Sequence, residues 1–223
     1  MDSETPPAAS DADVSAFPRL SAIEARILGS LVEKEATTPE NYPLTANAVV
    51  LACNQKNNRD PVMDLQPGAV GHALRELVDR RLTRYVEGAR AQRYEHRFAE
   101  SYSITKQQQA LLSVLLLRGP QTASELHARC ERLATFDGLE QVRDILERLI
   151  TRTPSLAVNL GRGAGQREDR YMHLLSGPVS AEQFAGVAKA TSMPARSSLE
   201  ARIEALEASV AALQAEMDAL RGH

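Results

Sequence analysis

The stretch RYEH at residues 93–96 recurs near the far end of the chain as RYMH at residues 170–173. Longer similarities surround this pair, because TANAVVLAC at residues 45–53 and TASELHARC at residues 122–130 align at the same offset of 77. Apolar residues before these stretches, at positions 27–32 and 111–116, align at an offset of 84. Apolar residues between TANAVVLAC and RYEH, at positions 70–77, align with positions 142–149 at an offset of 72. The offset changes only where loops are expected, so the repeats indicate two copies of one domain.

Both copies show the same predicted order of elements. A first helix carries an apolar stripe of helical period and opens with a capping box, Ser21–Glu24 in one copy and Thr105–Gln108 in the other. A second helix begins at Thr45 or at Thr122, where Thr122 and Glu125 form another capping box, and a third covers residues 68–81 or 139–151.

A two-stranded hairpin follows the third helix of each copy. In the first copy, LTRYVEG and QRYEHRF flank a turn at Gly88 and Ala89, and in the second copy LAVNLGRG and EDRYMHLL flank a glycine-rich tip. Three helices followed by a hairpin are typical of the winged helix-turn-helix, in which the third helix can enter a DNA groove and the hairpin is the wing.

The repeated RYxH motif therefore lies on the returning strand of each hairpin. Strand alternation places Tyr94 and His96 on the face opposite to Arg93 and Glu95. We expect the tyrosine to pack on the helices and the arginine to face water, and we expect no catalytic role for the histidine.

Three stretches resemble the signatures of the bacterial YceH-like family, namely LTANAVVLACNQKNNRDPV, LLLRGPQT and GQREDRYMHLL. The resemblance covers residues 19–176. It implies a pair of winged helices and leaves the activity to be argued from the residues.

The predicted fold class is mainly α with small β-hairpins, comprising two tandem winged helix-turn-helix domains and a C-terminal coiled-coil helix. The predicted parts are a disordered acidic tail (1–18), winged-helix domain 1 (19–102), winged-helix domain 2 (103–176), a linker with a short helix (177–197) and the coiled-coil helix (198–223).

The net charge of −3 averages over unlike segments. Residues 1–17 carry −4 and residues 199–223 carry −3, which leaves residues 18–198 at +4. This mildly basic body permits contact with a polyanion, although it is less basic than a dedicated nucleic-acid binder.

Apolar residues of the C-terminal segment follow the alternating steps of four and three that define a heptad repeat. They are Leu199, Ile203, Leu206, Val210, Leu213, Met217 and Leu220. The β-branched residues at a and the leucines at d favour a parallel two-stranded coiled coil, and hence a homodimer. The alternative is an amphipathic helix that folds back on its own domains.

The loop NQKNNRDP at residues 54–61 is the best local candidate for contact with phosphates or bases. It combines side-chain amides with two cations, in Gln55, Lys56, Asn57, Asn58 and Arg59. The same side chains could instead brace an irregular loop from within.

In the third helix of the first copy, Gln66, His72 and Arg75 are predicted to be exposed, and Arg90 and Arg93 flank the tip of the hairpin. The third helix of the second copy exposes Glu140, Asp144 and Glu147 alongside Arg143 and Arg148, and the phosphates of a duplex would repel these acids. The glycines near residue 163 lie between strands, so they indicate a hairpin tip and not a dinucleotide-binding loop.

The sequence favours a regulator-like protein that binds double-stranded DNA through domain 1. The alternative is a protein–protein interaction module without nucleic-acid activity. Aromatic residues make up 4% of the chain, the five histidines lack metal-ligand spacing, and the nucleophile and P-loop motifs are missing, so we expect no enzyme, no metal and no cofactor. We expect a cytoplasmic location, with no membrane partner.

Overall fold

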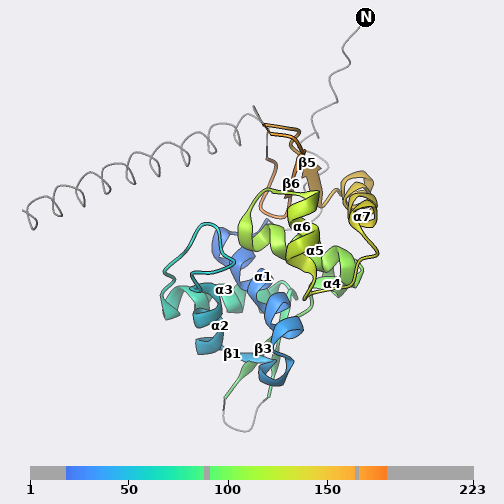
Figure 1. Ribbon diagram of the computed structural model, residues 1–223. Helices are drawn as coiled ribbons and strands as arrows, with labels where there is room; N and C mark the ends of the chain where they lie inside the picture. Colours follow the sequence, from blue (N-terminus) through green and yellow to red (C-terminus); the bar gives the residue numbers. More distant parts are fainter. Residues whose placement is uncertain (1–18, 88–90, 164–165, 180–223) are drawn as a thin grey trace, which may run out of the picture. The chain divides into compact units, whose positions relative to one another are not determined.

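The computed structural model describes residues 19–87, 91–163 and 166–179 (Figure 1). All of them belong to the first of two units into which the chain divides, Met1–Val179. The predicted acidic tail, linker and coiled coil lie outside the described residues. The described part is mainly helical, with small antiparallel β-hairpins, as predicted. Within it, no helix is long and apolar enough to cross a membrane.

The first half of the unit contains three main helices and three short strands. In chain order these are α1 (Ala22–Thr37), the 3-10 turn η2 (Pro39–Asn41), β1 (Leu44–Thr45), α2 (Ala46–Cys53), α3 (Pro67–Asp79), β2 (Thr83–Val86) and β3 (Arg93–His96). The strands pair antiparallel in the order β1-β3-β2, which places β3 in the centre of the sheet.

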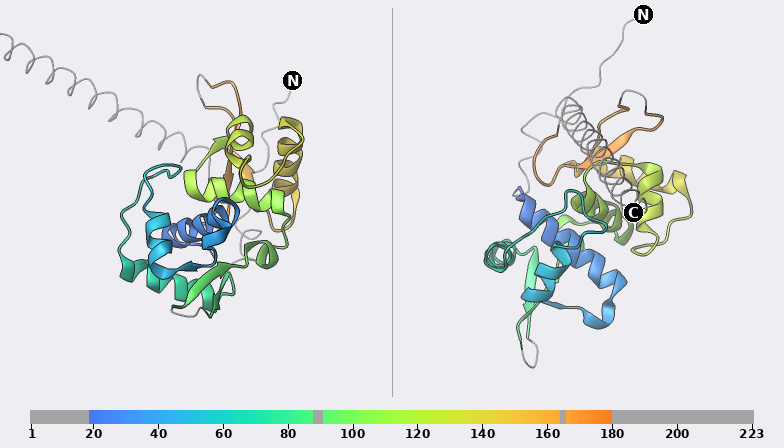
Figure 2. Two further views of the ribbon diagram at one scale, coloured as in Figure 1. Left: turned by 60° about the horizontal axis from the view of Figure 1, so that its bottom comes forward. Right: turned by 60° about the vertical axis from the view of Figure 1, so that its left-hand side comes forward.

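The second half repeats this order after a short connecting helix, α4 (Phe98–Tyr102). Its elements are α5 (Lys106–Arg118), β4 (Gln121–Thr122), α6 (Ala123–Cys130), α7 (Leu139–Thr151), β5 (Ala157–Asn159) and β6 (Arg170–His173). The strand order β4-β6-β5 matches that of the first half. In every view, the two hairpins lie at opposite ends of the unit (Figures 1 and 2).

The capping boxes predicted at three helix starts are all confirmed. At Ser21, Thr105 and Thr122, the hydroxyl accepts from the amide three residues on, and the Glu or Gln at that position accepts from the capping residue. Each box satisfies two of the amides that a helix start leaves unpaired. The third helix of the first half ends at Asp79, earlier than predicted, because Arg81 adopts a left-handed φ of 58°.

The central helices α1 and α5 lie side by side and are buried on every face over nine successive residues each (Figures 1 and 2). The two helices approach closely at Gly29. A Cβ added there would lie 2.8 Å from Leu117 Cγ and 3.2 Å from the carbonyl oxygen of Ser113. Glycine is therefore required at this crossing, and one continuous core spans both halves.

We expect Gly29→Val to destabilise the protein by about 1–3 kcal/mol, because the added methyl groups would force α1 and α5 apart. Gly71→Ala in α3 is the matched control, since the nearest atom to its added Cβ is Arg75 Nη1 at 3.8 Å. That change should stabilise the helix by roughly 0.5–1 kcal/mol. Urea unfolding measures both, and equal stabilisation of the two variants would contradict the close crossing.

Candidate nucleic-acid interface

Helix α3 presents one buried and one exposed face. Val70, Ala73, Leu74 and Leu77 are buried, as the sequence predicts. The predicted reading residues Gln66, His72 and Arg75 are exposed. Gln66 occupies the N-cap position, and its side chain makes no capping hydrogen bond. The first turn contains no acidic residue. The positive end of the helix dipole therefore favours an anion near the first turn, whereas Arg75 lies further along the helix, next to the exposed Glu76.

Two glycines, Gly68 and Gly71, leave the surface of α3 without projecting side chains at their positions. A Cβ added at Gly68 would meet nothing within 4 Å, and one added at Gly71 would meet only the tip of Arg75. Neither glycine is thus needed for packing inside the protein. Their effect is to expose the helix backbone, so that a flat or grooved partner can approach it closely.

The equivalent helix α7 carries acids where α3 carries Gly68, His72 and Arg75, although both helices also expose charges of the other sign, Glu76 and Asp79 on α3 and Arg143 and Arg148 on α7. At the offset of 72, Gly68 corresponds to Glu140, His72 to Asp144 and Arg75 to Glu147. All three acids are exposed. The two halves therefore share their buried stripes and differ in the electrostatics of the face that each third helix presents to solvent.

The β2–β3 hairpin contributes less free cationic charge than its sequence suggests. Tyr94 is buried, as predicted, and its ring centroid lies 5.2 Å from that of Tyr85, with the ring planes tilted by 59°. Arg93 does not face open water, because its guanidinium donates to the carbonyl oxygen of Pro43 at 2.7 Å. Arg84 is paired with Glu95. Arg90 lies outside the described residues.

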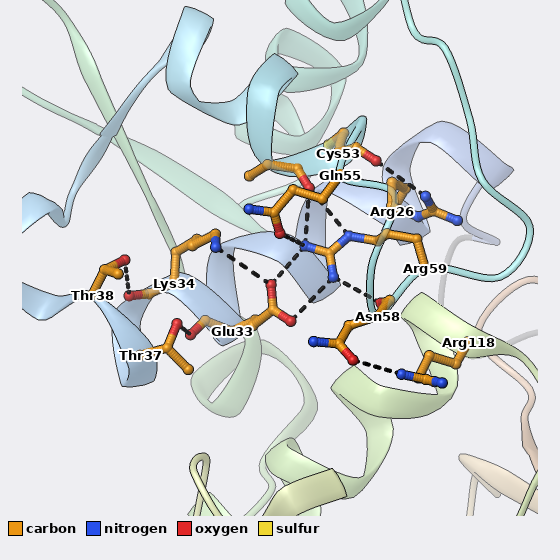
Figure 3. Close-up of polar contacts among 11 residues, drawn as sticks. Arg26, Glu33, Lys34, Thr37, Thr38, Cys53, Gln55, Asn58, Arg59 and Arg118 are labelled. Atoms are coloured by element: carbon orange, nitrogen blue, oxygen red, sulfur yellow. Dashed lines mark hydrogen bonds and ion pairs between the residues drawn. The ribbon is translucent and has the colours of Figure 1, made fainter.

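Arg59 is the clearest departure from the predicted contact set. Its side chain is 0% exposed and binds both carboxylate oxygens of Glu33, at 2.6 and 3.1 Å (Figure 3). It also donates to the carbonyl oxygen of Ala52 at 2.9 Å. A buried cation engaged in this way cannot reach a duplex. The prediction that Arg59 contacts DNA is therefore wrong, and Arg59 braces the loop instead.

A second buried arginine, which the sequence reasoning missed, completes this brace. Arg26 donates to the carbonyl oxygens of Cys53, at 3.1 Å, and Pro61, at 2.6 Å. The carbonyls of Ala52 and Cys53 belong to the last turn of α2, where helix carbonyls lack helical partners. Burial, and then the nearby Arg59, lowers the pKa of Arg26. The two arginines therefore cap the carboxyl end of α2.

Two of the remaining loop residues bond to the end of α5, in the second half of the unit, whereas Asn54 bonds to the backbone of Leu65 in its own half. Asn58 Oδ1 accepts from Arg118 Nη1 at 2.7 Å, and the amide of Asp60 donates to the carbonyl oxygen of Leu117 at 2.9 Å. Lys56 and Asn57 are exposed, and Gln55 accepts from Arg59.

The predicted contact residues thus divide into two groups. Gln66, His72 and Arg75 lie on α3, whereas Gln55, Lys56, Asn57 and Asn58 lie beside α5 and α6. The residues predicted for dimerisation, 199–220, lie outside the described residues. Within the described ranges, no group of three or more His, Cys, Asp or Glu side chains could hold a metal ion.

Comparison with known proteins identifies one family. The family model described as "Protein of unknown function, DUF480" matches residues 20–166, which span both halves. A UPF0502 protein of Mesorhizobium japonicum is 53% identical over 206 residues, covering 92% of this chain and 98% of that protein. A UPF0502 protein of Pseudomonas aeruginosa is 60% identical over 163 residues, covering 73% of each chain. These names state no activity, substrate or partner.

We expect Arg59→Ala to destabilise the protein by about 3–5 kcal/mol, because it would leave the partly buried carboxylate of Glu33 with only the longer contact of Lys34 Nζ, at 3.9 Å. Arg75→Ala removes the same side chain from an exposed position and should change the stability by no more than about 0.5 kcal/mol. Urea unfolding followed by circular dichroism compares the two. Equal stability of both variants would show that the Arg59–Glu33 pair does not hold the loop.

Proposed function

This chain belongs to the DUF480 family, and we propose that it binds double-stranded DNA through the first half of its folded unit. Helix α3 would lie in the major groove, with Gln66, His72 and Arg75 toward the base edges. The tip of the β2–β3 hairpin would lie beside the phosphate backbone.

We propose further that each half is a winged helix. The order of elements in both halves supports this, since a helix, a short strand, two helices and a hairpin follow one another with the same strand order. The hairpin is then the wing and α3 or α7 the recognition helix. The resemblance to the YceH-like family points to the same pair of domains.

The observation that carries the DNA proposal is the exposed face of α3. Its first turn contains no carboxylate, and Arg75 is exposed. Gly68 and Gly71 carry no side chain that would keep a partner away from the helix backbone. Arginine and glutamine are competent to read guanine and adenine edges. The acids at the matching positions of α7 would be repelled by phosphates, so the first half is the proposed reader.

A protein-interaction module without nucleic-acid activity is the second candidate. It is favoured by Leu51, which lies on α2 with 65% of its surface exposed, and by the charged face of α7. Isolated exposed leucines are common on monomeric proteins, which is why this candidate ranks second.

We expect micromolar or tighter binding to duplex DNA, with an affinity that falls steeply between about 50 and 200 mM salt as counterions are released. Arg75→Ala should weaken binding about tenfold, because it removes one contact made by the reading helix. Fluorescence anisotropy with a labelled duplex measures both effects.

Arg148→Ala on α7 is the matched control, because it removes the same exposed charge from the second half. It should leave the affinity unchanged within about twofold. If both variants bind as tightly as the natural chain, or if no duplex binds at low salt, the protein-interaction candidate replaces the DNA proposal.

We also propose that residues 198–223 pair two chains as a parallel coiled coil, which would present two copies of α3 to two half-sites. The support is the heptad pattern of the sequence. In light scattering, a chain that ends at Ser198 should be monomeric, with about half the mass of the dimer that the full-length chain forms. A full-length chain that is already monomeric at about 50 µM would contradict the pairing, since a stable heptad seam should associate at that concentration.

A further inference from the structure

A polar groove of about 730 Å³ opens where the two halves meet along α1 and α5. The first half contributes the last turns of α1 and the start of the loop between α2 and α3. The second half contributes the end of α5, the end of α6 and the turn that follows it. The groove is therefore lined by the same elements of both copies of the repeat.

Cations dominate the lining of this groove. They are Lys34, Lys56, Arg118, Arg129 and Arg132. Lys34 and Arg118 occupy equivalent positions at the offset of 84. Burial, and then the neighbouring Arg129, lowers the pKa of Arg118, as expected where cations are crowded.

Two acidic residues line the groove, and one of them is already neutralised. Glu33 binds Arg59 through both carboxylate oxygens and lies 3.9 Å from Lys34 Nζ. The other, Glu131, is exposed at the rim. Arg129 has a contact with Glu125 at 3.4 Å. Lys56 and Arg132 are exposed and make no ion pair within the described residues. An excess of positive charge therefore remains.

Two of the three side-chain amides that line the groove already accept a hydrogen bond. Gln55 Oε1 accepts from Arg59 and Asn58 Oδ1 accepts from Arg118, so the NH₂ groups of these two amides are left to donate (Figure 3). Guanidinium, ammonium and amide donors then converge on one cavity. Aromatic side chains are missing from the described residues that line it, so it offers no platform on which a nucleobase would stack.

From this donor-rich lining, we propose that the groove binds a small molecule that carries two or more phosphate groups. Phosphate oxygens only accept hydrogen bonds, and guanidinium groups bind them with two parallel bonds. The volume falls within the range of roughly 300–1,000 Å³ that is usual for small-molecule sites.

The site is independent of the proposed DNA-binding face. No residue of α3 lines the groove within the described part of the chain, and its walls belong to both halves. Binding of phosphates in the groove therefore does not require that α3 binds DNA, and either proposal can fail alone.

The test uses the full chain and isothermal titration calorimetry at low salt, with inorganic tripolyphosphate and pyrophosphate as probes and sulfate as the reference anion. Tripolyphosphate should bind with a Kd below about 1 mM and more tightly than pyrophosphate, because more of its oxygens reach donors. The double variant Lys56→Gln/Arg132→Gln should weaken tripolyphosphate binding at least about tenfold. Both side chains are exposed, so we expect this variant to fold.

The matched control is Arg81→Gln/Arg148→Gln, which removes the same number of exposed charges outside the groove and outside the proposed DNA contacts. It should change the Kd by no more than about twofold. An equal loss in both double variants, binding of sulfate as tight as that of tripolyphosphate, or no binding of either phosphate would overturn the proposal. The affinity of the Lys56→Gln/Arg132→Gln variant for a short DNA duplex gives one further test. If this affinity falls as much as the affinity for tripolyphosphate, the groove holds a nucleic-acid backbone, and the proposal is overturned.

Discussion

The contact between α1 and α5 is the constraint on which the unit depends. Each of these helices is buried all round for nine residues, and such a helix needs neighbours on every side. Gly29 and Ser113 occupy equivalent positions of the repeat, and both lie at the crossing. Small residues there let the two backbones approach, and the cores of the two halves become one. The halves are thus repeated in sequence but are joined in packing.

This joint core also places the loop that follows α2. The amide of Asp60 donates to the carbonyl oxygen of Leu117, in the last turn of α5, and Arg118 holds the side chain of Asn58. From within the first half, Arg26 and Arg59 bind carbonyls at the end of α2. The loop is consequently fixed from both halves, and Gln55, Lys56, Asn57 and Asn58 line the groove between them.

Much of the fold could be predicted from the sequence because the signals were local. The capping boxes gave the helix starts, and the periodic apolar residues gave the buried stripes of α3 and α7. The two-residue strands β1 and β4 were missed, since a strand that short has no periodicity to detect.

The candidate site was harder to predict, because its decisive contacts join residues that are distant in sequence. Arg59 was grouped with exposed cations, although Glu33, which lies 26 residues earlier, draws it into the interior. Arg118, Arg129 and Arg132 resemble ordinary surface charges in the sequence, and they form one cationic lining only when the two halves pack together. By contrast, Gln66, His72 and Arg75 were placed correctly from helical periodicity alone.

Divergence between the two copies explains why one fold can carry two different surfaces. The interior positions tolerate little change, because they must fill the shared core. Equivalent outward positions differ freely, as His72 on α3 and Asp144 on α7 show. Even the repeated RYxH motif has diverged, since His96 bonds to Glu35 at 3.0 Å whereas burial alone lowers the pKa of His173 to about 4. The second copy thus presents a differently charged helix face on α7, while its α5 and α6 still complete a groove that neither half could form alone.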